Sequence, residues 1–258
     1  MIPLHIIMPM AGEGSRFKDA GYTVPKPLIK FEGKELYRHA LESLNFEDKD
    51  IEIKYTFIVR KEFITDYHID EEIKKYYPNA NIISVEKTTR GALETLMLAK
   101  DLIDSKDYVI SMDCDIKFDC KEYCENIYHK LQTNSIYPMV LSFKSNNPIY
   151  SYIRSRRENY GDLVAEKEVI SNYALGGCYC LGAGYRLKNA AEKYIKDYEK
   201  GYIKAKELYL SLVYNYIIDI YLTDARIISM NPEKDHYWSL GTPYDLEHYN
   251  YNRNIWDE

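Results

Sequence analysis

The order of apolar and polar residues in the first half of the chain predicts strands that alternate with helices. Buried strands are predicted for four short apolar runs: 4–9, 53–59, 80–85 and 107–112. Apolar residues recur at helical spacing in the segments between them: 35–45, 62–76 and 91–102. This alternation predicts a parallel sheet with helices on both faces and right-handed connections.

From about residue 137 the pattern changes to strand-like runs joined by short turns. These runs are 137–143, 148–155, 160–167 and 173–181. A helix pair at 185–199 and 205–217, a strand near 219–229 and a helix from 243 are then expected. We therefore predict an α/β fold with a Rossmann-like mixed, mostly parallel sheet. Because no linker or repeat interrupts the pattern, we expect one domain over 1–258, with halves of about 1–135 and 136–258.

Composition narrows the class of protein. The net charge of −6 argues against a general role in binding nucleic acid or a membrane surface. No apolar run is long enough to span a bilayer. The cysteines are odd in number and form no CxxC pair, which argues against a disulfide framework or a structural zinc site. We expect a reduced, cytoplasmic protein. The sequence leaves open whether the protein forms a homo-oligomer.

A glycine-rich segment follows the first predicted strand. It reads Met10, Ala11, Gly12, Glu13, Gly14, Ser15, Arg16, and Pro25-Lys26-Pro27 follows shortly afterwards. In open α/β sheets ligands bind at the carboxyl ends of strands, and glycine lets backbone N–H groups approach a phosphate closely. The segment is neither a P-loop nor a dinucleotide fingerprint, because no Lys-Ser or Lys-Thr follows Gly14 and Phe17 occupies the third glycine position. Alone it is equally typical of a tight turn, but Arg16 and the proline-flanked Lys26 favour an anion site.

Two carboxylates end the strand predicted at 107–112. Asp113 and Asp115 are alternate residues, so in an extended segment they face the same side. Carboxylate oxygens in this place are suitable ligands for Mg²⁺. A polar strand end that faces water is the alternative.

The motifs resemble the nucleotidyltransferases with a GT-A-like fold, the sugar-phosphate pyrophosphorylase superfamily. The glycine segment and Pro25-Lys26-Pro27 match its signature A-G-x-G-[ST]-R-[FL] followed by P-K-P-[LM]. Its pattern V-x-E-K-x-x-x-S-x-x-A-x-x-G-x-Y is carried by Val164, Glu166, Lys167, Ser171, Ala174, Gly177 and Tyr179. The segment 237–246, YWSLGTPYDL, is similar to the family's W-x-D-x-G-T-P-x-D. The resemblance spans residues 8 to 246 in family order.

For the nucleotide, the resemblance implies that the backbone from Gly12 to Ser15 and Arg16 hold the phosphates of a nucleoside triphosphate. Base choice would come from the backbone around Met10 and Ala11. Lys26 would stabilise charge at the α-phosphate and on the leaving pyrophosphate. Asp115 is the implied Mg²⁺ ligand, with Asp113 beside it. Arg90 and Gly91 stand where family members contact base and ribose, although a plain helix start explains them equally well.

For the acceptor, the resemblance implies that Lys167 binds its phosphate and that Gly177 contributes to its site. Glu166 would contact either the acceptor or the ribose. Trp238 either lies in the core or forms a wall of that site. Ser239 replaces a metal-binding Asp of the family, so Asp113, Asp235 or water would have to substitute. The arginines 154, 156 and 157 could anchor a carboxylate, Arg154 first among them, or could belong to a solvated hairpin edge.

The implied reaction joins a phosphorylated acceptor to a nucleoside triphosphate and releases pyrophosphate. It needs no general base, because the attacking phosphate oxygen is already anionic near neutral pH. The residues within the motifs resemble a branch of this superfamily that is found in bacterial capsule gene clusters. One kind of enzyme in that branch converts CTP and L-glutamine phosphate into CDP-L-glutamine. A sugar-1-phosphate nucleotidylyltransferase using UTP, dTTP or CTP is the alternative. A non-catalytic nucleotide-binding regulatory subunit is a third possibility, against which Lys26, Lys167 and Asp115 argue.

Overall fold

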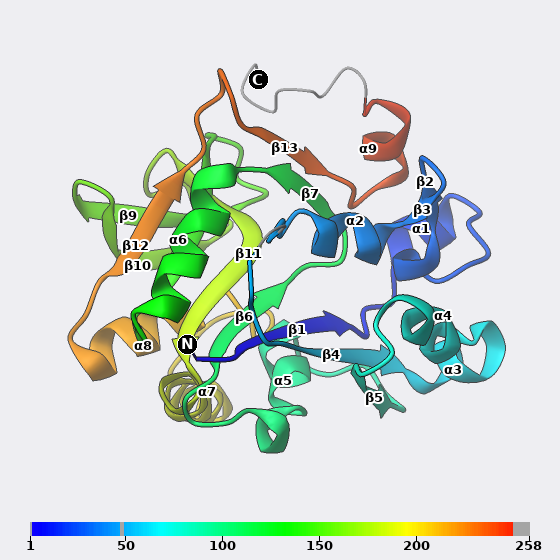
Figure 1. Cartoon of the computed structure of the whole chain (residues 1–258), viewed down its shortest axis with the longest axis horizontal. Helices are drawn as coiled ribbons and strands as arrows, with labels where there is room; N and C mark the ends of the chain where they lie inside the picture. Colours follow the sequence, from blue (N-terminus) through cyan, green and yellow to red (C-terminus); the bar gives the residue numbers. More distant parts are fainter. Residues whose placement is uncertain (1, 47–48, 250–258) are drawn as a thin grey trace.

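A computed structural model describes residues 2–46 and 49–249, which contain one nine-stranded sheet (Figure 1). Its order is β5-β4-β1-β6-β11-β8-β12-β10-β9. The strands are β1 (Leu4–Met10), β4 (Ile53–Arg60), β5 (Asn81–Val85), β6 (Tyr108–Met112), β8 (Met139–Lys144), β9 (Ser151–Arg157), β10 (Tyr160–Glu166), β11 (Tyr173–Ala183) and β12 (Ala225–Ser229). In this sheet only β10 and β11 run opposite to the other strands. The predicted mixed, mostly parallel α/β sheet is therefore confirmed.

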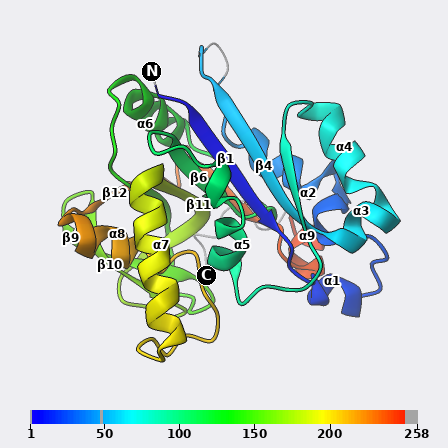
Figure 2. The ribbon, with the colours of Figure 1, turned by 90° about the horizontal axis from the view of Figure 1, so that it is seen from below.

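Helices cover both faces of the sheet, and each face has its own core (Figure 2). One core contains residues of α2 (Leu36–Glu42), α3 (Lys61–Tyr67), α4 (Ile69–Tyr76) and α6 (Lys121–Gln132). The other contains residues of α5 (Ala92–Met97), α7 (Gly184–Glu199) and α8 (Val213–Tyr221). Along β1, Ile6 and Met8 pack into the first core and Ile7 into the second, as the alternation of a strand requires.

Short elements gather at the carboxyl ends of β1 and β6. They are α1 (Ser15–Asp19), the 3-10 turn η1 (Lys26–Leu28), β2 (Lys30–Phe31), β3 (Lys34–Glu35), β7 (Ile116–Asp119), β13 (His236–Ser239) and α9 (Pro243–Glu247). β7 and β13 pair as an antiparallel ribbon beside the main sheet. A small core of Phe17, Ile29, Leu36 and Leu240 ties these elements together, so residues far apart in the chain are held around one end of the sheet.

Several differences from the predicted secondary structure concern the helices. The helix predicted at 62–76 is two helices, separated by His68 in a left-handed conformation with φ of 51°. The helix predicted at 205–217 begins only at Val213, and residues 219–221 end that helix instead of opening a strand. α6 and a second 3-10 turn, η2 (Lys100–Leu102), were not predicted as separate elements. Of the helix expected from 243, residues from 250 onward lie outside the described part.

Two expectations from composition can be compared with the structure. All five cysteines are buried, and none forms a disulfide. Among the described residues, no helix has the length and apolar character needed to cross a membrane.

Candidate active site

The glycine-rich segment leads from the end of β1 directly into α1. Gly14 has a φ of +64°, which favours glycine, and a Cβ there would approach the Cβ of Lys26 to 3.2 Å. Glycine therefore allows the loop and Lys26 to lie against one another. The first cavity, of about 230 Å³, is lined by Pro9, Met10, Gly12, Gly14, Ser15, Arg16, Phe17, Lys26, Pro27, Asp113, Cys114, Asp115 and Gly241.

Lys26 reaches from η1 across this cavity to the end of β6. Its ammonium forms an ion pair with the carboxylate of Asp115, and both side chains are largely buried. Burial opposes the charge of Lys26, but the neighbouring Asp115 outweighs it and raises the pKa of the lysine. Lys26 is thus a positioned cation, as predicted from its two flanking prolines.

Asp113 and Asp115 follow Met112, the last residue of β6, and lie close to one another. Burial, and then the negative charge of Asp115, raise the pKa of Asp113 to about 7. Two glycines make room for the pair: a Cβ on Gly177 would lie 2.8 Å from Oδ2 of Asp113, and one on Gly241 would lie 2.7 Å from Oδ2 of Asp115. Gly177 belongs to β11 and Gly241 follows β13, so two distant segments cradle the carboxylates.

A second cavity lies on the other side of this aspartate pair and shares both carboxylates with the first. It is lined by Asp113, Asp115, Ile116, Ile149, Tyr150, Ser151, Glu166, Leu175, Gly177, Tyr179, Tyr237 and Ser239. Tyrosine, serine and carboxylate side chains supply its polar lining. A molecule in either cavity would therefore meet the same two aspartates.

Glu166 ends β10 and is the third carboxylate of the second cavity. Its Oε2 accepts hydrogen bonds from the hydroxyls of Ser151 on β9 and Ser211, the latter at 2.7 Å. Ser211 is buried and belongs to the segment before α8. No motif in the sequence pointed to Ser211, because it lies 45 residues from Glu166 along the chain.

Lys167 follows Glu166 but does not line either cavity. It has a left-handed φ of 57°, and its backbone N–H donates to the carbonyl of Tyr150. Its exposed ammonium lies 5.3 Å from the centre of the Tyr209 ring. The structure thus places the predicted acceptor lysine beside the second cavity rather than in its wall.

Four of the predicted nucleotide contacts do not line the first cavity. Ala11 is buried, and Glu13 is exposed with its Oε1 3.4 Å from the Thr88 hydroxyl. Arg90 forms ion pairs with Glu94 and Glu199. Gly91 lies against the backbone of residue 208, where a Cβ would approach a carbonyl oxygen to 2.5 Å, so its observed role is close packing.

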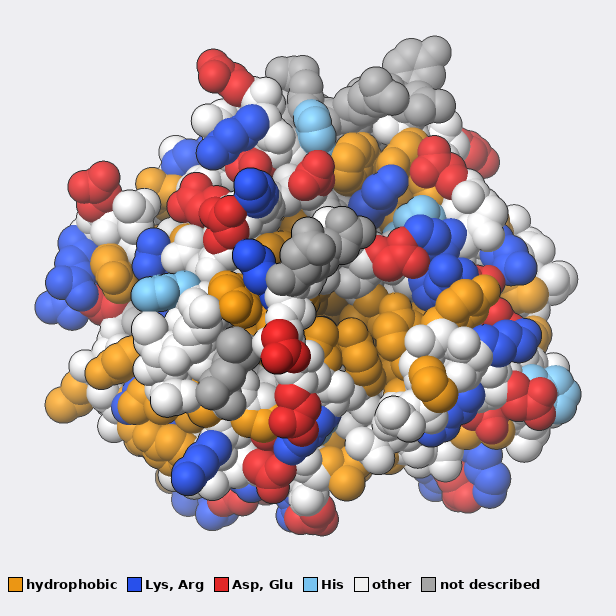
Figure 3. All heavy atoms as spheres, viewed as in Figure 1, with side chains coloured by type: hydrophobic (Ala, Val, Ile, Leu, Met, Phe, Trp, Pro, Cys, Tyr) orange, Lys and Arg blue, Asp and Glu red, His pale blue; other side chains and the backbone are white. Residues whose placement is uncertain are grey.

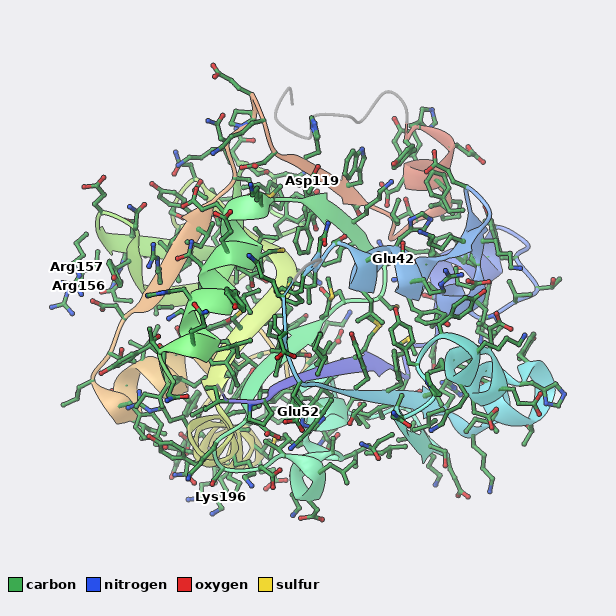
Figure 4. All side chains as sticks on the ribbon, in the orientation of Figure 1. Glu42, Glu52, Asp119, Arg156, Arg157 and Lys196 are labelled. Carbon is green, nitrogen blue, oxygen red and sulfur yellow. The ribbon has the colours of Figure 1, made fainter. Side chains whose placement is uncertain are left out.

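Arg154 is not brought to the second cavity, and this corrects the predicted carboxylate anchor. Its Nε and Nη2 donate to the two carboxylate oxygens of Asp162 across the β9–β10 hairpin, at 2.9 and 3.0 Å. Arg156 and Arg157 pair with Asp224 and lie at the edge of the molecule (Figure 4). In this structure the three arginines therefore pair with carboxylates at the hairpin edge instead of reaching the second cavity.

Trp238 does not line the second cavity, and Tyr237 takes that place. Alternation along β13 directs Tyr237 and Ser239 to the cavity, whereas Trp238 packs with Tyr249 and the small core of α1 and η1. Ser239 donates a hydrogen bond to Asp245 at 3.3 Å. Asp235 accepts from the backbone N–H of Asn231 and lines neither cavity, so it does not replace the missing carboxylate.

The aspartate pair fits a hard divalent cation. Two neighbouring, largely buried carboxylates, where burial and then mutual repulsion raise the pKa of Asp113, are the kind of donor set that a cation stabilises. Within residues 2–46 and 49–249 no group of three His, Cys, Asp or Glu side chains is arranged to hold a metal ion. A pair of carboxylates can nevertheless contribute to binding a divalent cation that completes its shell with water and substrate phosphates.

Comparisons with known proteins identify the family. A family model described as nucleotidyl transferase matches residues 4–252. A mannose-1-phosphate guanyltransferase of Neurospora crassa is 26% identical over 127 residues, which are 47% of this chain and 33% of that protein. The matched part therefore spans about a third of that relative's length.

Two solved structures share the fold. One is a nucleoside-diphosphate-sugar pyrophosphorylase from Vibrio cholerae RC9, with a TM-score of 0.75 and 22% identity over 95% of this chain and 98% of that chain. The other is an inositol-1-phosphate CTP transferase from T. maritima, with a TM-score of 0.71 and 14% identity over 98% and 95%. At these identities the likeness concerns the fold alone. Because the family model covers most of the sequence, the chain belongs to the nucleotidyl transferase family.

Proposed function

We propose that this protein transfers a nucleoside monophosphate from a nucleoside triphosphate to a phosphorylated small acceptor and releases pyrophosphate. One observation carries the proposal: two cavities meet at the shared pair Asp113 and Asp115. The first has glycine backbone and the cations Arg16 and Lys26, and the second has hydroxyls and Glu166. The arrangement suits two anionic substrates that must meet at one point.

On the nucleotide side, the backbone of Gly12 and Gly14 and the side chain of Arg16 bind the triphosphate. A phosphate oxygen of the acceptor attacks the α-phosphorus, and the bond from that phosphorus to the bridging oxygen of the β-phosphate breaks. The electron pair leaves with pyrophosphate. Lys26 stabilises the charge that accumulates there, and its positive charge is already fixed in place before reaction.

On the acceptor side, Glu166 accepts hydrogen bonds from the acceptor. Ser151 and Ser211 hold its carboxylate, so its free lone pairs point in a defined direction. Lys167 approaches the acceptor phosphate from the rim of the second cavity. A divalent cation such as Mg²⁺ on Asp113 and Asp115 would supply further positive charge between the two phosphates.

The lining of the second cavity favours an acceptor rich in hydroxyl groups. Among the described residues that line it, none is Lys or Arg. Glu166 could bind the ammonium group of glutamine phosphate, but its carboxylate would lack a cation, since Arg154 is held by Asp162. We therefore favour a sugar-1-phosphate over L-glutamine phosphate. CTP remains the proposed nucleotide.

A substrate panel tests this choice. We expect pyrophosphate release from CTP, UTP, dTTP, ATP or GTP to depend on a sugar-1-phosphate in the presence of Mg²⁺, with CTP preferred. Each nucleotide is assayed with several sugar-1-phosphates, with L-glutamine phosphate and with no acceptor. Turnover with glutamine phosphate alone would overturn the choice of acceptor, and preference for another nucleotide would overturn CTP. No acceptor-dependent turnover with any pair would contradict the proposed reaction and favour a regulatory subunit.

Ser211→Ala is expected to raise the KM for the acceptor by several-fold, because Glu166 loses one of the two hydroxyls that donate hydrogen bonds to it. The loss of one such hydrogen bond corresponds to about 1 kcal/mol. The KM for the nucleoside triphosphate should stay within about twofold of wild type, because changes at well-separated sites act almost independently. Ser211→Thr keeps the hydroxyl and should recover most of the loss. Steady-state kinetics with each substrate varied measures this, and equal changes in both KM values would remove Ser211 from a positioning role.

A further inference from the structure

A third cavity lies at the end of the sheet opposite to the candidate active site. It is lined by Lys130, Tyr137, Pro138, Arg157, Tyr160, Leu222, Thr223, Asp224 and Arg226 and has a volume of about 390 Å³. These residues lie at the amino ends of β8 and β12, in the last turn of α6 or beside the turn between β9 and β10. Since β8 and β12 run in the same direction as β1 and β6, their amino ends lie away from the carboxyl ends that carry Asp113. We term this hollow the amino-end cavity.

Strand pairing brings the cations of the amino-end cavity together. Arg226 pairs in register with Met139 on one side and with Tyr160 on the other. Three cations, Lys130, Arg157 and Arg226, face a single carboxylate, that of Asp224. This local excess of positive charge occurs in a chain whose net charge is −6. On the face shown in Figure 3, Lys and Arg side chains gather at the left margin, where Figure 4 places Arg156 and Arg157.

The available carboxylate does not serve all of these cations. Asp224 pairs with Arg157 at 3.4 Å and with Arg156 at 3.7 Å. Lys130 is only 9% exposed, and its ammonium is 3.4 Å from the hydroxyl of Ser135. Within the part of the chain that the structure describes, neither Lys130 nor Arg226 forms an ion pair with a carboxylate. A buried ammonium without an anionic partner is costly, so its presence beside a cavity points to an external anion.

The electrostatics of Lys130 agree with this geometry. Burial, and further the nearby charge of Arg226, lower the pKa of Lys130, whereas the Cys180 thiol opposes the shift. An anion in the cavity would offset the repulsion between Lys130 and Arg226. A dianion is better suited than a single carboxylate, because the two cations require two negative charges and one of them is buried.

Aromatic rings complete the wall of the amino-end cavity. Tyr137 is half exposed, and the guanidinium of Arg157 lies 4.5 Å from the centre of the Tyr160 ring. Behind Tyr137, the guanidinium of Arg186 lies 5.1 Å from its ring centre, and its buried Nη1 has no hydrogen-bond partner in the described structure. Arg186 therefore adds positive charge next to Tyr137, and the exposed ring of Tyr137 offers a flat surface for the rest of a ligand.

We propose that the amino-end cavity is a second binding site, specific for a small phosphorylated ligand whose phosphate is held by Lys130 and Arg226. The site is separate from Asp113 and Asp115 and does not depend on the proposed transfer reaction. A phosphate group supplies two negative charges near neutral pH and several acceptor oxygens, which suits two cations that have no carboxylate partner in the described structure.

Calorimetric titration with inorganic pyrophosphate tests the proposal in a buffer free of divalent cations. We expect Lys26→Met, which weakens binding in the first cavity, to retain a pyrophosphate site. In the Lys26→Met background, Lys130→Met should weaken that remaining site by at least about tenfold, as expected for the loss of a hydrogen bond to a charged group. Arg226→Gln in the same background provides a second, more exposed substitution with the same expected direction.

Two controls keep the result interpretable. Lys196→Met removes an exposed lysine on α7 that lines none of the three cavities and should leave binding unchanged (Figure 4). Lys130→Met alone should fold and retain wild-type turnover, because it removes a buried cation far from Asp115. Loss of all pyrophosphate binding in Lys26→Met, or unchanged binding after both Lys130→Met and Arg226→Gln, would overturn the proposal.

Discussion

Asp115→Asn is expected to lower the rate of pyrophosphate release by about 10³-fold or more, equivalent to about 4 kcal/mol in the activation barrier. The substitution keeps the shape of the side chain but removes a charge that faces both cavities. It removes a cation ligand and at the same time releases Lys26 from its ion pair. Acceptor-dependent pyrophosphate release at saturating Mg²⁺ and nucleotide measures the effect.

The double variant Asp115→Asn, Lys26→Met is the matched control for stability. Asp115→Asn alone leaves the largely buried Lys26 without its partner, so its free energy of unfolding should fall. The double variant removes that unpaired charge and should unfold at a higher temperature than Asp115→Asn while staying inactive. Near-wild-type turnover in a folded Asp115→Asn variant would remove this carboxylate from the site.

Lys26→Met is expected to lower kcat by about 10²- to 10³-fold, with a smaller change in affinity for the nucleotide. The reason is that its charge is most valuable when negative charge moves onto pyrophosphate. Steady-state kinetics gives kcat, and calorimetric titration with a non-hydrolysable nucleotide gives affinity.

Two other lysines provide the comparison for Lys26→Met. Lys18→Met removes an exposed lysine of α1 that does not line the first cavity and should have no effect on either quantity. Lys167→Met should raise the KM for the acceptor and leave nucleotide affinity unchanged. Loss of nucleotide affinity in Lys167→Met but not in Lys26→Met would reverse the two assignments.

The strands at the centre of the sheet could be predicted because each is a short, continuous apolar run. β1, β4 and β6 lie within a residue or two of their predicted bounds. Residues 205–212 could not be predicted in the same way. There the chain is held by backbone hydrogen bonds from Leu208 to Arg90 and from Leu93 to Leu208. Such long-range pairing leaves no periodic signal in the sequence.

The same distinction applies to the candidate site. Asp113, Asp115 and Lys26 could be predicted, because strand ends and flanking prolines fix their positions locally. Arg154 could not be placed correctly, since its partner Asp162 comes from the facing strand of a hairpin whose register contains bulges. Ser211 had no local signal at all, because its role depends on the tertiary contact with Glu166.

In the proposed reaction the aspartate pair lies between two substrates whose phosphates are joined. A reaction with nucleoside triphosphate labelled with ³²P at either the α- or the γ-phosphate tests this most directly. With Mg²⁺ and acceptor, we expect the α-label to appear in a nucleoside-diphosphate conjugate of the acceptor and the γ-label to appear in pyrophosphate. Release of the γ-label as orthophosphate, or no transfer of the α-label to any acceptor, would contradict it.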